Sequence, residues 1–403
     1  MDNNLIKNSS LYLLIVAFVL LLGGCENSTS PEESGHSNDI EAFIWAFDDD
    51  SGRVSIYDVH NEIPKNTYTA SAFSMMHCFM AGPATEPTVW MAKSNKAYAF
   101  TGGFDLSHGD HAHKEAPMEY AAIAVGNNPV HMGSTPSGDS VAFANDGDGT
   151  VSIIDVITRE VVQTCTHGSG HSSALLTGEY LITTPATASG ETWAKIIDIT
   201  RDSILDSLDI GAGAHGDAYY AAEKKAFIAI TDGIAVIDVA ARAVSKTIPY
   251  TETGRTNFLY HGHNNRFAAG LHKTDSGTSD KLLILDMASD KLEYLAIPNA
   301  SLPWNISKGQ FALSADGTAA VISDNVALKI YHVTLATKAV KTLNAPAAAC
   351  AVATDENGTF VWALAGSNVS MFHVAENRKI DTFPVDQGVD WIYVTSTTVE
   401  AVQ

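Results

Sequence analysis

Three histidines recur at matching places in a repeated pattern, and their side chains are candidates for one shared metal site. The pattern runs from Pro129 to Val239 in three copies, each with a histidine near its start and an apolar-aspartate-apolar triplet at its end. The histidines are His131, His171 and His215, spaced 40 and 44 residues apart. Neutral imidazole is a good zinc ligand, and three of them with an open fourth position make a tetrahedral site. That chemistry requires a fold that brings three distant segments together.

The length of the repeat predicts such a fold, an all-β β-propeller in which each copy is one four-stranded blade. An apolar-acidic-apolar ending marks the third strand of each blade, with histidine in place of the acid in the last two: Asp58, Asp155, Asp198, Asp238, Asp286, His332 and His373. We place one more blade between Asp58 and Asp155, with its third strand at Tyr120–Val125, which gives eight blades. Seven blades result if the first and last segments complete a single blade. The alternating run Trp391–Val402 is expected to supply the inner strand of the first blade and close the ring, because closure leaves no open edge.

The propeller fold also predicts where the three histidines lie. The first strand of each blade lines the central channel, and each histidine precedes a second strand by about the length of a first strand and its turn. We therefore expect the three side chains to converge at the mouth of the channel. Asp217 and His167 are candidates for a fourth ligand or for an outer residue that orients a ligand. The alternative is that histidines lining the channel only hold buried water.

A second cluster, His108, Asp110, His111 and His113, lies in the polar segment Leu106–Pro117. A short His/Asp tract in a glycine-containing loop has a metal-binding composition, although a solvated loop with chance histidines looks the same. We place the segment between the second and third strands of the second blade, on the face of the channel mouth. A loop beside a fixed site indicates capture and hand-over of metal rather than catalysis.

The first 39 residues are expected to lie outside the propeller. Residues 1–24 form a predicted signal peptide, because the apolar run Leu11–Leu22 is too short to span a bilayer. Its end, Leu22-Gly23-Gly24-Cys25, is typical of a bacterial lipobox with Cys25 as the lipidated residue; the alternative is a plain secretory signal with a chance cysteine. Residues 25–39 are rich in serine and acids and predict a flexible tether. Residues 40–403 then form a single propeller domain, outside the cytoplasm and attached to a bacterial membrane through the lipid alone.

Charge and cysteine content narrow the function classes. The net charge of −22 argues against nucleic acid as a partner and favours cations. The sequence contains no Walker or Rossmann glycine pattern. Besides Cys25 there are three cysteines, Cys78, Cys165 and Cys350, which allow at most one disulfide.

Three stretches resemble a known family: Asn128-Pro129-Val130-His131, His167–Leu175 and Ala214-His215-Gly216-Asp217-Ala218. Together with the histidine-rich loop they are similar to AztD-type periplasmic zinc metallochaperones, most sharply between about residues 105 and 240. The resemblance implies a β-propeller that binds zinc in the periplasm and passes it to the solute-binding protein of a zinc ABC transporter. It also implies a zinc site at His131, His171 and His215 with a supporting site in the loop. The lipid anchor departs from that family.

The predicted function is therefore a monomeric zinc-binding lipoprotein that stores zinc or delivers it to a transporter's solute-binding protein. Copper remains an alternative metal. An alternative without metal is a propeller of the YVTN or surface-layer type that acts in adhesion or as an interaction module. An enzyme is a third reading, since an open three-histidine site can activate water, but the sequence offers no general base in register with the histidines. We expect no catalytic activity.

Overall fold

The computed structural model describes residues 40–60, 65–69, 78–81, 87–105, 113–168, 170–185, 191–256, 258–262, 266–274, 278–279, 281–297, 302–303 and 309–398. All of them belong to one compact unit, Ile40–Gln403. The predicted signal peptide, Cys25 and the tether lie outside the described residues, as do His108, Asp110 and His111.

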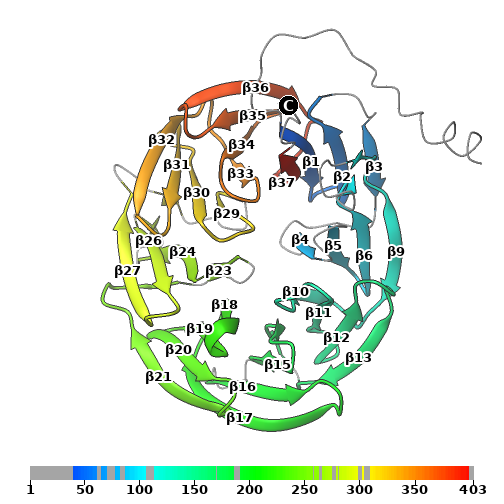
Figure 1. Cartoon of the computed structure of the whole chain (residues 1–403), viewed down its shortest axis with the longest axis vertical. Coiled ribbons are helices and arrows are strands. Elements are labelled where there is room, and N and C mark those ends of the chain that lie inside the picture. Colours follow the sequence, from blue (N-terminus) through cyan, green and yellow to red (C-terminus); the bar gives the residue numbers. More distant parts are fainter. Residues whose placement is uncertain are drawn as a thin grey trace, which may run out of the picture. The chain divides into compact units, whose positions relative to one another are not determined.

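The described strands form eight antiparallel sheets that follow one another around a ring, as the sequence predicts (Figure 1). From the inner to the outer strand, blades 1 to 4 consist of β37 (Trp391–Thr398), β1 (Ile40–Asp48), β2 (Arg53–Asp58) and β3 (Asn66–Thr69); β4 (Cys78–Ala81), β5 (Thr88–Lys93), β6 (Lys96–Thr101) and β9 (Glu119–Ala124); β10 (Pro129–Ser134), β11 (Ser140–Asn145), β12 (Thr150–Asp155) and β13 (Val161–Thr166); β14 (Leu175–Leu176), β15 (Tyr180–Thr183), β16 (Glu191–Asp198) and β17 (Ser203–Ala212).

Blades 5 to 8 continue the order, and the inner strand of blade 6 is split in two. Their strands are β18 (Asp217–Tyr220), β19 (Lys225–Ile230), β20 (Gly233–Asp238) and β21 (Ala243–Pro249); β22 (Arg255–Thr256) with β23 (Tyr260–His261), β24 (Phe267–Lys273), β26 (Lys281–Asp286) and β27 (Lys291–Ala296); β29 (Phe311–Leu313), β30 (Ala319–Asp324), β31 (Lys329–Thr334) and β32 (Ala339–Asn344); β33 (Ala351–Thr354), β34 (Phe360–Ala365), β35 (Asn368–His373) and β36 (Arg378–Pro384). Two small sheets join β7 (Phe104–Asp105) to β8 (His113–Lys114) and β25 (Thr278–Ser279) to β28 (Leu302–Pro303).

Each blade buries its middle strands and exposes its outer one. In blade 3, β11 is buried from Val141 to Asn145, whereas the outer strand β13 buries only Cys165. Residues on both faces of the middle strands are apolar because each blade lies between two others. The core therefore consists of clusters between neighbouring blades; one of them joins Ala142 and Val151 of blade 3 to Leu181 of blade 4.

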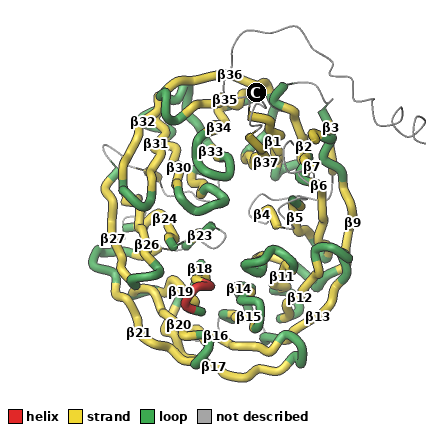
Figure 2. The backbone as a smooth tube through the Cα atoms, in the orientation of Figure 1, coloured by secondary structure: helices red, strands yellow, loops and turns green. Residues whose placement is uncertain are grey.

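The ring is closed by the carboxyl-terminal strand, as predicted. Strand β37 pairs with β1 along its length, from Ile40 opposite Thr398 to Phe47 opposite Trp391. Trp45 Nε1 donates a buried hydrogen bond of 3.0 Å to Thr395 Oγ1 across this pair. The last strand thus completes the first blade (Figure 2), and because the described residues form eight sheets of four or five strands with this blade counted once, the seven-blade alternative is excluded.

Blade 2 differs from the prediction. The segment assigned as its third strand is the outer strand β9, and the third strand is β6, which pairs with β5 on one side and β9 on the other. The error arose because β6 ends at Thr101 and lacks the acidic residue that marks the other third strands. Consequently, the histidine-rich segment connects the third and fourth strands of this blade, not the second and third.

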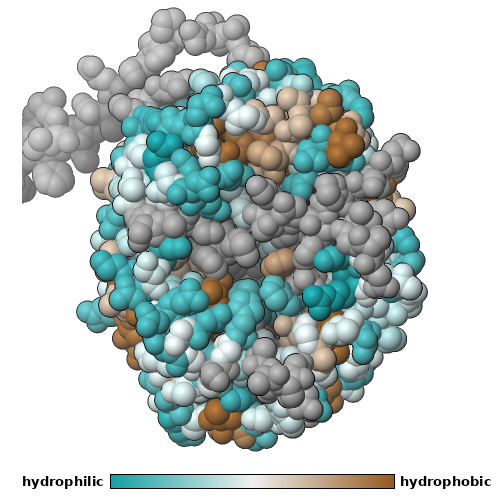
Figure 3. All heavy atoms as spheres, turned by 180° about the vertical axis from the view of Figure 1, so that it is seen from behind, coloured by the Kyte–Doolittle hydropathy of each residue, from teal (hydrophilic) through white to brown (hydrophobic). Residues whose placement is uncertain are grey.

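Among the described residues, helical structure is limited to one 3-10 turn, Ala221–Glu223, and none of it is long and apolar enough to cross a bilayer. The face opposite to that in Figure 1 shows mostly hydrophilic or near-neutral residues, with apolar residues in small separate groups (Figure 3).

Candidate metal centre

The three repeated histidines lie where successive blades begin. His131 is in β10, just after a β-bulge between Pro129 and His131, a feature that re-aims a side chain. His171 lies in the loop that leads from β13 to β14, and His215 lies in the loop that leads from β17 to β18. The backbone amide of His215 donates to the carbonyl of Ala229, which fixes this loop against β19. Three neighbouring blades therefore each contribute one imidazole.

These imidazoles converge. One nitrogen from each ring lies within 4.8 Å of the other two, and among the residues that the structure describes this is the group with metal-ligand geometry. Ring centroids of His131 and His171 are 4.5 Å apart, and each lies 5.5 Å from that of His215. The side chain of His171 is about half exposed, with 47% of its surface accessible. The cluster thus combines three nearby nitrogens with access from outside.

Asp146, which is not among the site residues expected from the sequence, orients one of the three rings. Its Oδ2 atom accepts a hydrogen bond of 2.7 Å from Nδ1 of His171. Asp146 belongs to the turn between β11 and β12, and its backbone amide donates to the carbonyl of Asn128. A carboxylate on Nδ1 directs Nε2 of the same ring toward a metal and raises its basicity. The sequence signal that could have identified Asp146 is an aspartate in a hairpin turn of the blade that contains the predicted ligand His131.

The hydrogen bonds restrict the tautomers of His131 and His171. Because neutral His171 donates through Nδ1 to Asp146, its Nε2 is the acceptor in the 2.8 Å hydrogen bond with Nε2 of His131. In this arrangement His131 donates from Nε2, and it would bind a metal through Nε2 only after that proton had moved to Nδ1.

For His131 and His171, zinc binding requires only a small movement. A tetrahedral zinc with Zn–N bonds of about 2.1 Å holds its nitrogen ligands roughly 3.4 Å apart. The two Nε2 atoms of His131 and His171, 2.8 Å apart, would therefore have to separate by roughly 0.6 Å. Rotation of an exposed side chain such as His171 can supply that shift. The role of the three histidines as metal ligands stays a prediction.

The two candidates for a fourth position lie outside the cluster of nitrogens. Asp217 begins β18, and burial raises its pKa to about 6, while a hydrogen bond from Ser173 opposes that rise. His167 is fully buried after β13, and burial, followed by the charge of Lys195, lowers its pKa. The backbone carbonyl of His167 accepts a hydrogen bond from Lys195 Nζ. Both residues lie near the site, but neither belongs to the group of converging ligand atoms.

The histidine-rich segment starts at the face of the ring opposite to the three-histidine cluster. The prediction that it starts on the face of the channel mouth is therefore wrong. Strand β6 leads away from the turn next to Asn128, and its six residues span roughly 20 Å. His113, in β8, is exposed, and the following residue Lys114 forms ion pairs of 2.6 Å with Asp58 and Glu41. Asp58 ends a third strand, at the edge opposite to the turn that carries Asp146. The segment does not begin beside the three-histidine cluster because successive antiparallel strands reverse direction.

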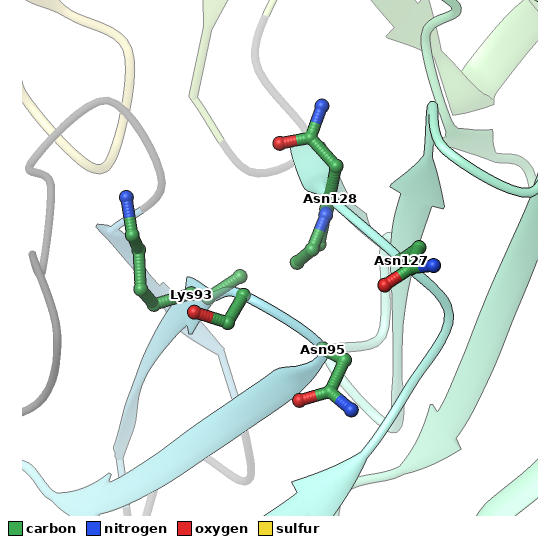
Figure 4. A pocket seen from close by; sticks show the side chains of 7 residues that line it. Lys93, Asn95, Asn127 and Asn128 are labelled. Atoms are coloured by element: carbon green, nitrogen blue, oxygen red, sulfur yellow. The ribbon is translucent and has the colours of Figure 1, made fainter.

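A polar hollow lies beside the site between blades 2 and 3. It encloses about 620 Å³ and is lined by Ala92, Lys93, Ser94, Asn95, Asn127, Asn128 and Pro129. The labelled side chains in Figure 4 are amides and one lysine, so this hollow offers no set of metal ligands. Asn128 connects it to the site through the backbone hydrogen bond to Asp146.

The fold and the site together define an eight-bladed β-propeller in which three histidines, one from the start of each of three consecutive blades, meet. No family model and no curated protein matches the sequence. Among the solved structures that are similar to it are two of AztD from Citrobacter koseri. They are 14% identical to this chain and superpose with TM-scores of 0.69 for the apo form and 0.70 for the other.

The likeness to AztD extends over the whole fold. The apo structure covers 91% of this chain and 100% of AztD, and the other covers 89% and 99%. The resemblance predicted from the sequence is thus confirmed for the fold, which is that of AztD.

Enzymes have related folds. Hydrazine synthase from Kuenenia stuttgartiensis has a TM-score of 0.52 with 13% identity, and covers 77% of this chain and 96% of its own. The dihydro-heme d1 dehydrogenase NirN has a TM-score of 0.59 with 12% identity, and covers 93% and 78%. The fold alone therefore does not specify a function, and the side chains of the site must be considered.

Proposed function

We propose that this chain is an extracytoplasmic zinc-binding protein that holds one zinc ion at His131, His171 and His215. The observation that carries the proposal is the approach of one nitrogen from each ring to within 4.8 Å of the others. Asp146 adds support, because an outer carboxylate on a ligating imidazole is typical of zinc sites. The likeness of the fold to AztD agrees with a zinc-related role.

Delivery of this zinc to the solute-binding protein of a zinc ABC transporter is the second part of the proposal. Access to His171 from outside supports it, because a partner's ligand can reach the ion without prior unfolding. In this proposal the protein transfers zinc and catalyses no reaction. His108, Asp110, His111 and His113 act as a weaker capture site.

The decisive experiment is elemental analysis of protein purified without a histidine tag, followed by competition titration with a chromogenic chelator. We expect one tightly bound zinc in the wild type and none in His171→Ala. Replacement of His108, His111 and His113 together should leave the tight zinc in place. Absence of tightly bound metal in the wild type would instead favour an adhesion or interaction propeller.

The proposed location, outside the cytoplasm and attached through lipid on Cys25, has its own test. Changing Cys25 to Ser removes the only thiol in the predicted lipobox, so we expect uncleaved precursor and loss of lipid attachment. The measurement is metabolic labelling with a fatty-acid analogue together with membrane fractionation. Unaltered processing and fractionation of the variant would show that Cys25 is not the anchor.

A further inference from the structure

Phe258 occupies the place in blade 6 that histidine occupies in the three preceding blades. It follows His215 by 43 residues, close to the spacing between the histidines themselves, and it precedes β23 as His215 precedes β18. Its ring meets that of His215 edge to face, with centroids 4.7 Å apart and an interplanar angle of 85°. On the side of blade 6, the three-histidine cluster is therefore bounded by the phenyl ring of Phe258.

Aromatic neighbours hold Phe258 in this position. Its ring stacks on Tyr260 at 6.2 Å, and Tyr260 stacks on Phe311 at 5.3 Å. Phe258 also packs against the core cluster between blades 6 and 7 that contains Leu271. Behind it, a Cβ atom on Gly270 would lie 2.0 Å from the Phe258 carbonyl oxygen, so the strand behind approaches as closely as a glycine allows.

We propose that Phe258 determines how readily the site exchanges its metal, by closing the blade-6 side to a fourth protein ligand. This inference rests on the proposed metal binding at the three histidines. Sites with four protein ligands hold zinc structurally, whereas sites with three keep one exchangeable position. With a phenyl ring on the blade-6 side, the exchangeable position faces outward, where a donor or acceptor protein can supply the missing ligand.

The test is Phe258→His, measured with Zn²⁺ and with Co²⁺ as a spectroscopic probe. In the wild type, the visible spectrum of bound Co²⁺ should change when free imidazole is added, because one position is open. In Phe258→His we expect no response to imidazole and an affinity for zinc on the order of tenfold higher, which corresponds to about 1.4 kcal/mol. Zinc dissociation should slow by a similar factor.

Two matched variants separate a ligand effect from a packing effect. Ile157→His introduces the same side chain at an exposed position after β12, away from Phe258, and should behave as the wild type does. Phe258→Leu keeps an apolar wall and should retain the imidazole response. In the double variant His171→Ala with Phe258→His, three imidazoles are again present, so metal binding lost in His171→Ala should return.

The outcomes distinguish the two proposals. If the wild-type protein binds no metal, the proposed function fails. If it binds one zinc but Phe258→His still responds to imidazole and does not rescue His171→Ala, the role of Phe258 is wrong while the proposed function stands.

Discussion

At the scale of single residues, the hydrogen bond between Asp146 and His171 distinguishes the cluster from three histidines that happen to be neighbours. It fixes the proton on Nδ1 and therefore leaves Nε2 free to accept. Asp146 lies outside the repeated pattern of histidines, in a turn whose position depends on Asn128. The cluster of three histidines is thus organised by a residue that is not itself a predicted ligand.

We predict that Asp146→Ala weakens zinc binding by about 10- to 100-fold, the usual cost of losing the partner of a ligating histidine. Asp146→Asn, whose amide oxygen can still accept from Nδ1, should lose less. The measurement is competition titration with a chromogenic chelator. The control is Asp232→Ala, which removes an exposed aspartate from the turn between β19 and β20 in blade 5. It tests the effect of losing one negative charge. Equal affinities of Asp146→Ala and this control would contradict the orienting role.

At the scale of elements, the site depends on how closely β10 approaches the chain entering blade 4. A Cβ atom added to Gly133 would lie 2.1 Å from the carbonyl oxygen of Ala174, a distance that real contacts do not allow. Gly133 follows His131 by two residues, and Ala174 follows His171 by three. The separation of these two segments is therefore coupled to the separation of two predicted ligands.

Gly133→Ala should push the two segments apart and move His131 away from His171. We expect a loss of stability of about 1–3 kcal/mol, the range for overpacking, and weaker zinc binding. Chemical denaturation and chelator competition measure the two effects. A stable variant with unchanged zinc affinity would mean that the inner strands adjust without moving the ligands.

Asp355, in the turn between β33 and β34 of blade 8, is expected to make the stability of the protein depend on pH. Burial raises the pKa of Asp355 to about 6, although its Oδ1 accepts a hydrogen bond of 2.8 Å from the amide of Phe360. The folded chain therefore binds a proton that the unfolded chain has released, in the window from about pH 4 to about pH 6. Stability from this group is present below the window and is lost as the pH rises through it.

Asp355→Asn keeps the oxygen acceptor and removes the titration. We expect the variant to be more stable than the wild type at pH 7, by on the order of 2 kcal/mol, with a smaller difference at pH 4. Urea denaturation at a series of pH values measures this. Parallel stability curves for both proteins would show that Asp355 does not titrate in this window.

At the scale of the whole molecule, ring closure by β37 holds the first and last blades together. Trp391, Ile392 and Val394 of this strand belong to the same core cluster as Trp45 and Trp362. Strand β1 also pairs with β37 over its full length. Loss of the strand would expose both a sheet edge and this core.

We predict that a chain ending at Asp390 is unfolded or aggregates, whereas a chain ending at Thr398 melts as the wild type does. Thermal unfolding and size-exclusion chromatography compare the two. A monomeric, cooperatively melting chain without β37 would mean that the ring is stable without the inner strand of blade 1.

The sequence by itself determined the repeat, the all-β class, the closing strand and the three histidines, because these depend on periodicity and residue type. It did not determine the strand order of blade 2, because β6 ends at Thr101 without an aspartate or histidine marker, and the histidine-rich segment was therefore assigned to the wrong pair of strands. Only the tertiary structure showed that Asp146 is hydrogen-bonded to His171, 25 residues further along the chain. It also showed that the ring of Phe258 contacts that of His215, 43 residues earlier. Such contacts arise from the packing of one blade's turns against the next, which local sequence patterns do not encode.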